Sequence, residues 1–241
     1  MFCQFCGAKV DSNVRFCPTC GKPLAPGAAG PAPGVLPNYQ PPIQPPPTFT
    51  APPGTHAQIG HWISSGWNIV KADLGTFMVM SLVFVVLNSV VPIILQGPLI
   101  AGFYIVCARK VLYGRFEFGD LFKGFNFFVA ALVASILIAI FTFIGTLFCI
   151  IPGLVLAAMY MFTYLFIIDK RMDFWPAMQA SHSIVRNDYF GFTLFLIAVV
   201  LLNIVGLVCC LVGVLATMPI LYAAVTVAYK EIVGFEPNPN F

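Results

Sequence analysis

The chain has 241 residues, of which 59% are apolar and only 9% are charged, with a formal net charge of +3. Soluble domains carry charge on about 25% of their residues, so this composition excludes an ordinary soluble domain, and its hydrophobicity excludes disorder over most of the length. The small net charge also argues against a strongly basic nucleic-acid binder. An integral membrane protein fits best, and an unusually apolar soluble helical core is the alternative.

Four cysteines near the N-terminus follow the spacing C-x2-C-x10-C-x2-C; they are Cys3, Cys6, Cys17 and Cys20. Four thiolates bind Zn²⁺ tetrahedrally, and the two-residue spacing turns both sulfurs of a pair toward one metal. Residues 1–24 are therefore predicted to form a zinc ribbon with one structural Zn²⁺, whose binding supplies the folding free energy that so short a segment lacks. Residues 2–24 resemble the short zinc-ribbon domains found at the start of many prokaryotic membrane proteins.

Two disulfides or a redox C-x2-C motif are the alternatives for these cysteines. A cytosolic location disfavours disulfides, and the flanking sequence lacks the βαβ pattern of a thioredoxin-like fold. Nucleic-acid binding is disfavoured because only Lys9, Arg15 and Lys22 stand against Asp11. We expect the ribbon to contact a cytosolic protein or to have no partner.

Residues 25–56 are predicted to be a proline-rich linker. Twelve of the chain's twenty prolines lie between residues 23 and 53, and that stretch carries no charge. Such a composition is typical of a semi-rigid, polyproline-like spacer or a disordered tether. The run at residues 45–47 could instead bind a proline-recognising domain, but a plain tether is the simpler interpretation.

Residues 57–233 contain three charge-free blocks of 35, 45 and 41 residues: Leu74–Ala108, Gly124–Ile168 and Tyr189–Tyr229. A spanning helix needs about 20 residues. Gly or Pro breaks each block near its middle, at Pro92, Gly97 and Pro98, at Gly145, Pro152 and Gly153, and at Gly206 and Gly213. The glycines of the second and third blocks are expected to serve turns and close packing. The sequence therefore predicts an all-α membrane domain with about six transmembrane helices in three hairpins, at about 74–93, 97–113, 126–148, 151–168, 190–210 and 213–230. Four spans with re-entrant segments are the alternative.

All basic residues beyond the ribbon fall on the side opposite the three hairpin tips. The positive-inside rule places that side in the cytoplasm of a multi-pass cell-membrane protein, together with both termini and the short tail at 234–241. The polar, cysteine-rich start lacks the pattern of a signal peptide.

An internal repeat is predicted at a shift of 115 residues, which aligns Ile69–Asp73 with Ile184–Asp188 and Asn88 with Asn203. A weaker middle unit suggests three copies of one plan, in which a short amphipathic segment precedes each hairpin. These segments, at about 57–72, 116–125 and 173–187, are expected at the inner membrane interface. Their tryptophans are expected at the headgroup level: Trp62, Trp67 and Trp175.

The motif Ile151-Pro152-Gly153, with Tyr164, Asp169 and the run Trp175–Ser181, resembles the YciC-like group of bacterial membrane proteins. The membrane region attached to some glycerophosphodiester phosphodiesterases is similar. The resemblance covers roughly residues 57–233. It implies a polytopic helical domain and transfers no catalytic residue.

No catalytic residue and no cofactor besides zinc are predicted. The spans lack ionisable side chains at depth, which counts against an ion-coupled pump. Ser181, His182 and Asp188 lack a supporting hydrolase motif, so we interpret them as an interfacial polar face. Asn88 and Asn203 are expected to hold helices together, with substrate contact as the alternative.

The outer cysteines, Cys149, Cys209 and Cys210, are predicted to be small buried apolar residues, with a Cys149–Cys210 disulfide as the alternative. The leading hypothesis for function is a non-enzymatic integral membrane protein in the lipid bilayer, whose cytosolic zinc module serves protein interaction or assembly. A transporter or a lipid-handling protein is the alternative, because broken helices and internal repeats are common in transporters.

Overall fold

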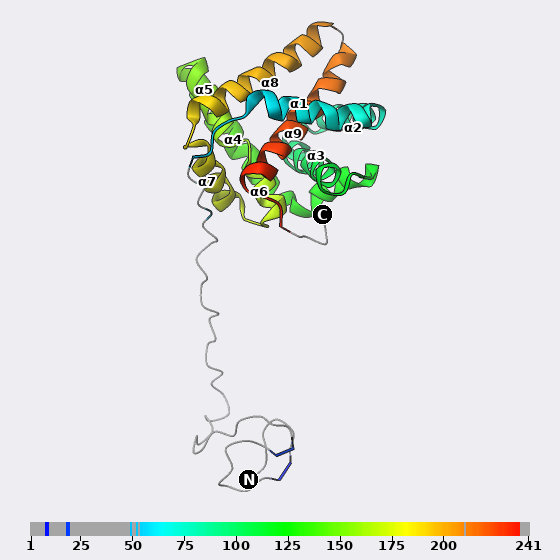
Figure 1. The fold of residues 1–241 in the computed structure, drawn as a ribbon, viewed down its shortest axis with the longest axis vertical. Coiled ribbons are helices and arrows are strands. Elements are labelled where there is room, and N and C mark those ends of the chain that lie inside the picture. The colour runs from blue at the N-terminus through cyan, green and yellow to red at the C-terminus, as the bar shows by residue number, and fades with distance from the viewer. Residues whose placement is uncertain are drawn as a thin grey trace. The chain divides into compact units, whose positions relative to one another are not determined.

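The computed structural model describes residues 8, 9, 18, 19, 49, 52, 54–209 and 211–236, with the backbone alone at 209, 211 and 212. The chain divides into two compact units, Met1–Ile43 and Gln44–Phe241. The described part of the second unit is helical, as predicted (Figure 1). Its helices, of which η1 is a 3-10 helix, are α1 (Ile59–Ala72), α2 (Leu74–Val90), α3 (Pro92–Tyr113), η1 (Phe118–Phe127), α4 (Phe128–Phe148), α5 (Ile150–Met159), α6 (Thr163–Asp169), α7 (Phe174–Val185), α8 (Tyr189–Cys209) and α9 (Leu211–Ile232).

Several stretches are long and apolar enough to cross a membrane. Five qualify alone: Pro92–Tyr113, Phe118–Phe148, Ile150–Asp169, Tyr189–Val208 and Gly213–Ile232. Helices α1 and α2 qualify only as a pair, and they meet at 97°. The described chain thus offers five or six spans and has the character of a multi-pass membrane protein.

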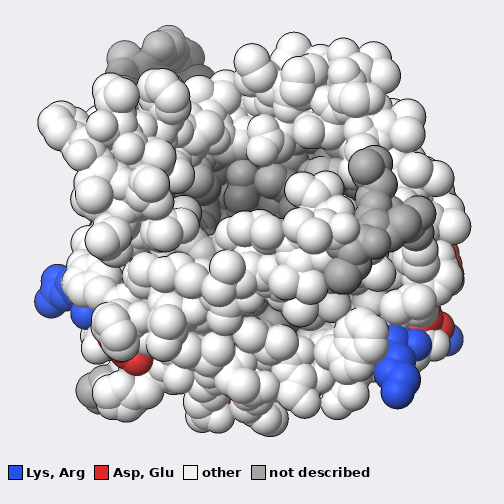
Figure 2. Space-filling view, turned by 90° about the horizontal axis from the view of Figure 1, so that it is seen from above, with Lys and Arg blue, Asp and Glu red and all other residues white. Residues whose placement is uncertain are grey.

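The outer surface of the helical unit is strongly apolar. Large side chains on α4 and α8 are exposed, among them Leu147 and Phe148 at 76% and 84%, and Phe190 and Val208 at 80% each. Figure 2 shows one face that is almost free of charged side chains and hollowed at its centre, with Lys, Arg, Asp and Glu only at its margin. Soluble proteins rarely expose apolar patches of this extent, whereas lipid tails would cover them.

The first hairpin turns earlier than predicted. Helix α2 ends at Val90 and α3 begins at Pro92, so the predicted boundaries at 93 and 97 are wrong. Proline suits the first position of a helix, because the N–H that it lacks has no acceptor there. Gly97 and Pro98, which the sequence suggested as turn residues, lie inside α3 instead.

Gly97 and Gly102 allow α3 to pack closely against α4 and η1. A Cβ atom on Gly97 would lie 2.3 Å from the carbonyl oxygen of Ala131, and one on Gly102 would lie 1.8 Å from that of Leu121. No side chain can be accommodated at either distance. The backbones therefore approach as closely as helices do at small-residue contacts in membranes.

Glycines also allow two other pairs of helices to pack closely, α4 with α5 and α8 with α9. On α5, a Cβ atom at Gly153 would lie 2.2 Å from the hydroxyl of Thr146 on α4. On α9, a Cβ atom at Gly213 would lie 2.2 Å from the carbonyl oxygen of Gly206 on α8. The prediction that these glycines serve close packing is confirmed, whereas the three-copy repeat stays a prediction.

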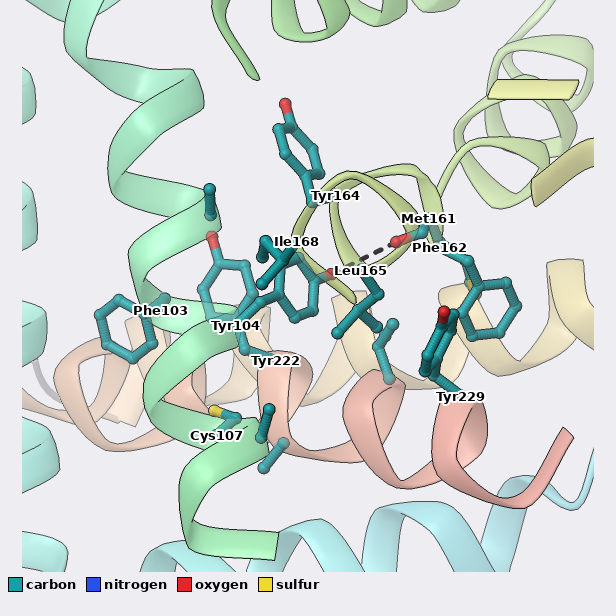
Figure 3. Close-up of a cluster of buried hydrophobic side chains, with 14 of the residues drawn as sticks. Phe103, Tyr104, Cys107, Met161, Phe162, Tyr164, Leu165, Ile168, Tyr222 and Tyr229 are labelled. Atoms are coloured by element: carbon teal, nitrogen blue, oxygen red, sulfur yellow. Dashed lines mark hydrogen bonds between the residues drawn. The ribbon is translucent and has the colours of Figure 1, made fainter. Parts of the chain in front are cut away.

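The core lies where α3, α6 and α9 meet (Figure 3). The predicted span at 151–168 is broken after α5, and the break leaves helix-end carbonyl groups that need donors. The hydroxyl of Ser181 donates to the Met159 carbonyl at 2.7 Å, and that of Tyr104 donates to the Met161 carbonyl at 3.4 Å. The Tyr104 ring also meets the Tyr222 ring edge-on, with centroids 5.2 Å apart.

Trp62 is a core residue, so its ring contacts protein rather than lipid headgroups, and its level in the membrane stays a prediction. Its side chain is 1% exposed, and its ring packs on Phe192 and Phe195 of α8. The indole Nε1–H donates to Glu231 of α9 at 2.7 Å, which supplies the partner that a buried tryptophan needs. Trp67 and Trp175 are exposed, as an interfacial position requires.

Candidate functional site

The predicted zinc ligands Cys3, Cys6, Cys17 and Cys20 lie outside the described residues, as do most of the linker and the end of the C-terminal tail. Within the part of the chain that the structure describes, no three His, Cys, Asp or Glu side chains are grouped to hold a metal ion. The candidate metal centre therefore rests on the spacing of the four cysteines.

Charged side chains of the helical unit join the ends of helices, and we call this set the polar layer. Its members pair across different helices, with the segments that connect them or, for Lys123, within η1: Asp73, Arg109, Lys110, Asp120, Lys123, Asp169, Lys170, Glu231 and Glu236.

Asp120 joins η1 to the end of α3. Its side chain is 1% exposed, and its Oδ1 atom lies 2.5 Å from Nη1 of Arg109 and 2.8 Å from Nζ of Lys123. The backbone N–H of Glu117 donates to Oδ2 at 2.8 Å. A buried carboxylate is costly unless it is paired in this way, so these partners fix the connection between α3 and η1. Lys110 pairs with Asp73 at the bend between α1 and α2.

Asp169 joins α6 to α9 and to the chain that follows α9. The carboxylate is buried and accepts the Tyr229 hydroxyl at 2.9 Å and the N–H of Glu236 at 3.0 Å. Lys170 pairs with the Glu236 carboxylate at 2.5 Å. Sequence reasoning did not identify Asp120 or Asp169 as buried acids, because each stands beside basic residues that suggest a solvated cluster. Only the motif of the family resemblance drew attention to Asp169.

Asp188 caps the first turn of α8. Its Oδ1 atom accepts the N–H of Gly191 at 2.8 Å, and Oδ2 accepts the N–H of Ala57 at 3.1 Å. Partial burial acts to raise the pKa of this carboxyl group, but the two N–H donors and His56, 3.7 Å away, outweigh burial and lower the pKa. The carboxylate therefore holds the start of α1 against the start of α8.

Ser181 and His182 have separate partners. The Ser181 hydroxyl accepts the N–H of Phe162 at 3.2 Å in addition to its bond to Met159. His182 Nε2 lies 2.8 Å from the hydroxyl of Tyr189. The structure therefore does not bring Ser181, His182 and Asp188 together through hydrogen bonds among the described residues.

Asn88 and Asn203, the asparagines that the predicted repeat aligns, differ in their hydrogen bonding. Asn203 on α8 accepts the hydroxyl of Thr217 on α9 at 3.1 Å, which confirms its predicted role in holding helices together. Asn88 on α2 is half-buried, and its Oδ1 atom is buried without a hydrogen-bond partner among the described residues.

The outer cysteines are only partly described. Cys149 is exposed and its thiol has no disulfide partner among the described residues, so the expectation that it is buried is wrong. It lies between α4 and α5 at the tip of their hairpin, beside the exposed side chains of Phe148 and Ile150. The side chains of Cys209 and Cys210 lie outside the described part of the chain, and the Cys149–Cys210 disulfide stays a prediction.

A cavity of about 410 Å³ lies between α5 and α8, lined by Ile151, Val155, Tyr189, Phe190, Thr193, Leu194 and Ile197. Ligand sites usually combine apolar walls with a few converging polar groups. The lining of this cavity is almost wholly apolar, and the transporter or lipid-handling alternative stays a prediction.

Comparison with known proteins supports the ribbon. Residues 2–24 match the family model of a zinc-ribbon domain, which confirms that part of the predicted resemblance. An uncharacterized protein of Mycobacterium bovis and one of Mycobacterium tuberculosis are each 31% identical to this chain over 103 residues, which is 43% of this chain and 32% of theirs. This chain thus spans about a third of the length of those relatives. No solved structure matches the chain, and the resemblance to the YciC-like group stays a prediction.

Proposed function

We propose that this chain is a membrane protein whose zinc ribbon lies in the cytosol and binds a protein partner. The observation that carries the proposal is a match to a zinc-ribbon domain at residues 2–24, joined through a proline-rich stretch to helices that can cross a membrane. Four thiolates fill the coordination shell of Zn²⁺ and leave no open position for catalysis. The metal therefore serves to fold a small surface, which a proline-rich tether of this length would present on the order of 90 Å from its anchor when extended.

Deletion of residues 2–24 and the substitution Cys20→Ser are both expected to remove the partner. The full-length protein and each variant would be purified from membranes after mild crosslinking, and the recovered proteins would be quantified by mass spectrometry. We expect the recovered amount of at least one protein to fall about tenfold or more in both variants, because both variants lack the folded ribbon. Cys149→Ser is the matched control, since its thiol is exposed and free on the helical unit. Recovery of the same proteins at the same levels from all variants would exclude the proposal.

The cytosolic location follows from the distribution of basic residues and can be tested separately. Arg115 and Arg171 are exposed residues in the segments between candidate spans. In a chain that keeps the four ribbon cysteines but has serine at positions 107, 149, 209 and 210, Arg115→Cys and Arg171→Cys would each add one reactive thiol. An impermeant maleimide should label either position only after permeabilisation of the cells, with the parent chain as background. Labelling of either position in intact cells would reverse the topology.

A further inference from the structure

A small polar cavity lies beside the segment that connects α3 to η1. Its volume is about 180 Å³, and it is lined by Arg109, Arg115, Phe116 and Glu117. We call it the arginine cavity. It belongs to the helical unit and has no part in the proposed role of the ribbon.

The segment that carries Arg115 is held in place. Gly114 adopts a left-handed conformation with φ of 70°, and its N–H donates to the Lys110 carbonyl at 3.0 Å. The Lys110 ammonium donates to the carbonyl of Gly114 at 3.1 Å and lies 5.7 Å from the centre of the Phe116 ring. That ring packs on Phe77, with centroids 4.9 Å apart. The cavity wall is therefore a built surface.

The guanidinium of Arg109 has hydrogen-bond partners for only some of its N–H groups among the described residues. Its Nη1 atom pairs with Asp120, but its Nε atom is buried and has no hydrogen-bond partner among the described residues. Because a buried atom has almost no contact with solvent, the part of Arg109 that lines the cavity is the rest of its guanidinium and side chain. Arg115 is exposed, and no ion pair of its side chain occurs within the described ranges.

We propose that the arginine cavity binds a phosphate group. Two guanidinium groups line it, and a planar guanidinium matches a phosphate through paired, charge-assisted hydrogen bonds. The volume suits one phosphate group and excludes a whole lipid or nucleotide. Glu117 repels the anion and limits the affinity. The cavity lies between the ends of two candidate spans, Pro92–Tyr113 and Phe118–Phe148, where a phospholipid headgroup would lie if these helices cross a bilayer. A soluble phosphate presents the same chemistry.

Binding would be measured in two arms with the full-length protein in detergent. In the first, native mass spectrometry would compare the occupancy of phosphatidic acid with that of phosphatidylcholine. In the second, thermal unfolding would be followed with inorganic phosphate and with chloride at equal ionic strength. Binding of both phosphatidic acid and inorganic phosphate assigns the site to the phosphate group alone, and binding of phosphatidic acid only assigns it to a lipid headgroup. Absence of preference in both arms would overturn the proposal.

Four variants separate the cavity from general surface charge. Arg115→Gln should lower the affinity for the preferred ligand about tenfold, because it removes one charged hydrogen-bonding partner. Arg109→Lys keeps a cation near Asp120 but lacks the planar guanidinium that matches a phosphate, and it should weaken binding without a large loss of thermal stability. Glu117→Gln should strengthen binding a few-fold by removing a like charge.

Arg186→Gln is the matched control, because Arg186 is an exposed arginine at the end of α7 and does not line the cavity. It should leave binding unchanged. Equal losses in Arg115→Gln and Arg186→Gln would show diffuse electrostatic binding, and the proposed site would be wrong. The same conclusion would follow if Glu117→Gln weakened binding.

Discussion

Replacement of Cys20 or Cys3 by serine is expected to abolish zinc binding and to unfold the N-terminal ribbon. The native chain should carry about one zinc ion, since four thiolates complete one tetrahedral shell. Metal binding contributes about 10–16 kcal/mol to the folding of small structural zinc domains, and a segment of this size has almost no core to replace that contribution. The zinc content per chain, measured by elemental mass spectrometry on protein purified with reductant, should fall from about one to near zero.

The control for this experiment is Cys149→Ser, which removes an exposed free thiol of the helical unit. Its zinc content should equal that of the native chain. Two disulfides in the ribbon are the competing chemistry, and they would lower the intact mass of the untreated chain by four hydrogens while leaving it free of zinc. That result would contradict the zinc ribbon.

Among the substitutions of glycine by alanine in the helical unit, Gly102→Ala is expected to lower the stability of the folded protein most. The added Cβ atom would lie 1.8 Å from the carbonyl oxygen of Leu121, and this neighbour is backbone, which cannot rotate away. Overpacking of a core usually costs about 1–3 kcal/mol, and a backbone contact belongs at or above the upper end of that range. We expect loss of most of the folded protein, measured as the monodisperse fraction in detergent and as a lower midpoint of thermal unfolding.

Gly75→Ala is the matched control on α2, because no described atom beyond the adjacent residues and the nearby backbone of its own helix lies within 4 Å of the added Cβ position. Alanine is favoured over glycine inside a helix by about 0.5–1 kcal/mol, so this variant should be as stable as the native chain or slightly more stable. If both alanine variants unfold at the same temperature, the close contact between α3 and η1 is absent.

Local patterns in the sequence predicted most of the helical organisation. The charge-free blocks indicated where apolar helices lie, and the amphipathic segments at 57–72 and 173–187 correspond to α1 and α7. Helix ends were harder to place. Pro92 and Pro98 both suggested a turn, yet α3 begins at the first and continues through the second, because the packing of Gly97 and Gly102 against neighbouring backbone holds the helix together.

The sequence by itself determined the chemical class of this protein and its match to a zinc-ribbon domain, and it predicts the zinc ligand set, because composition and cysteine spacing are local properties. Only the tertiary structure decided which polar and aromatic residues face protein. Trp62 meets Glu231 across 169 residues, and Asp169 meets Tyr229 across 60. In a membrane protein the lipid and the protein interior are both apolar, so hydrophobic periodicity does not distinguish the two environments. The burial of Trp62 and Asp169 therefore depends on distant partners that no local pattern reveals.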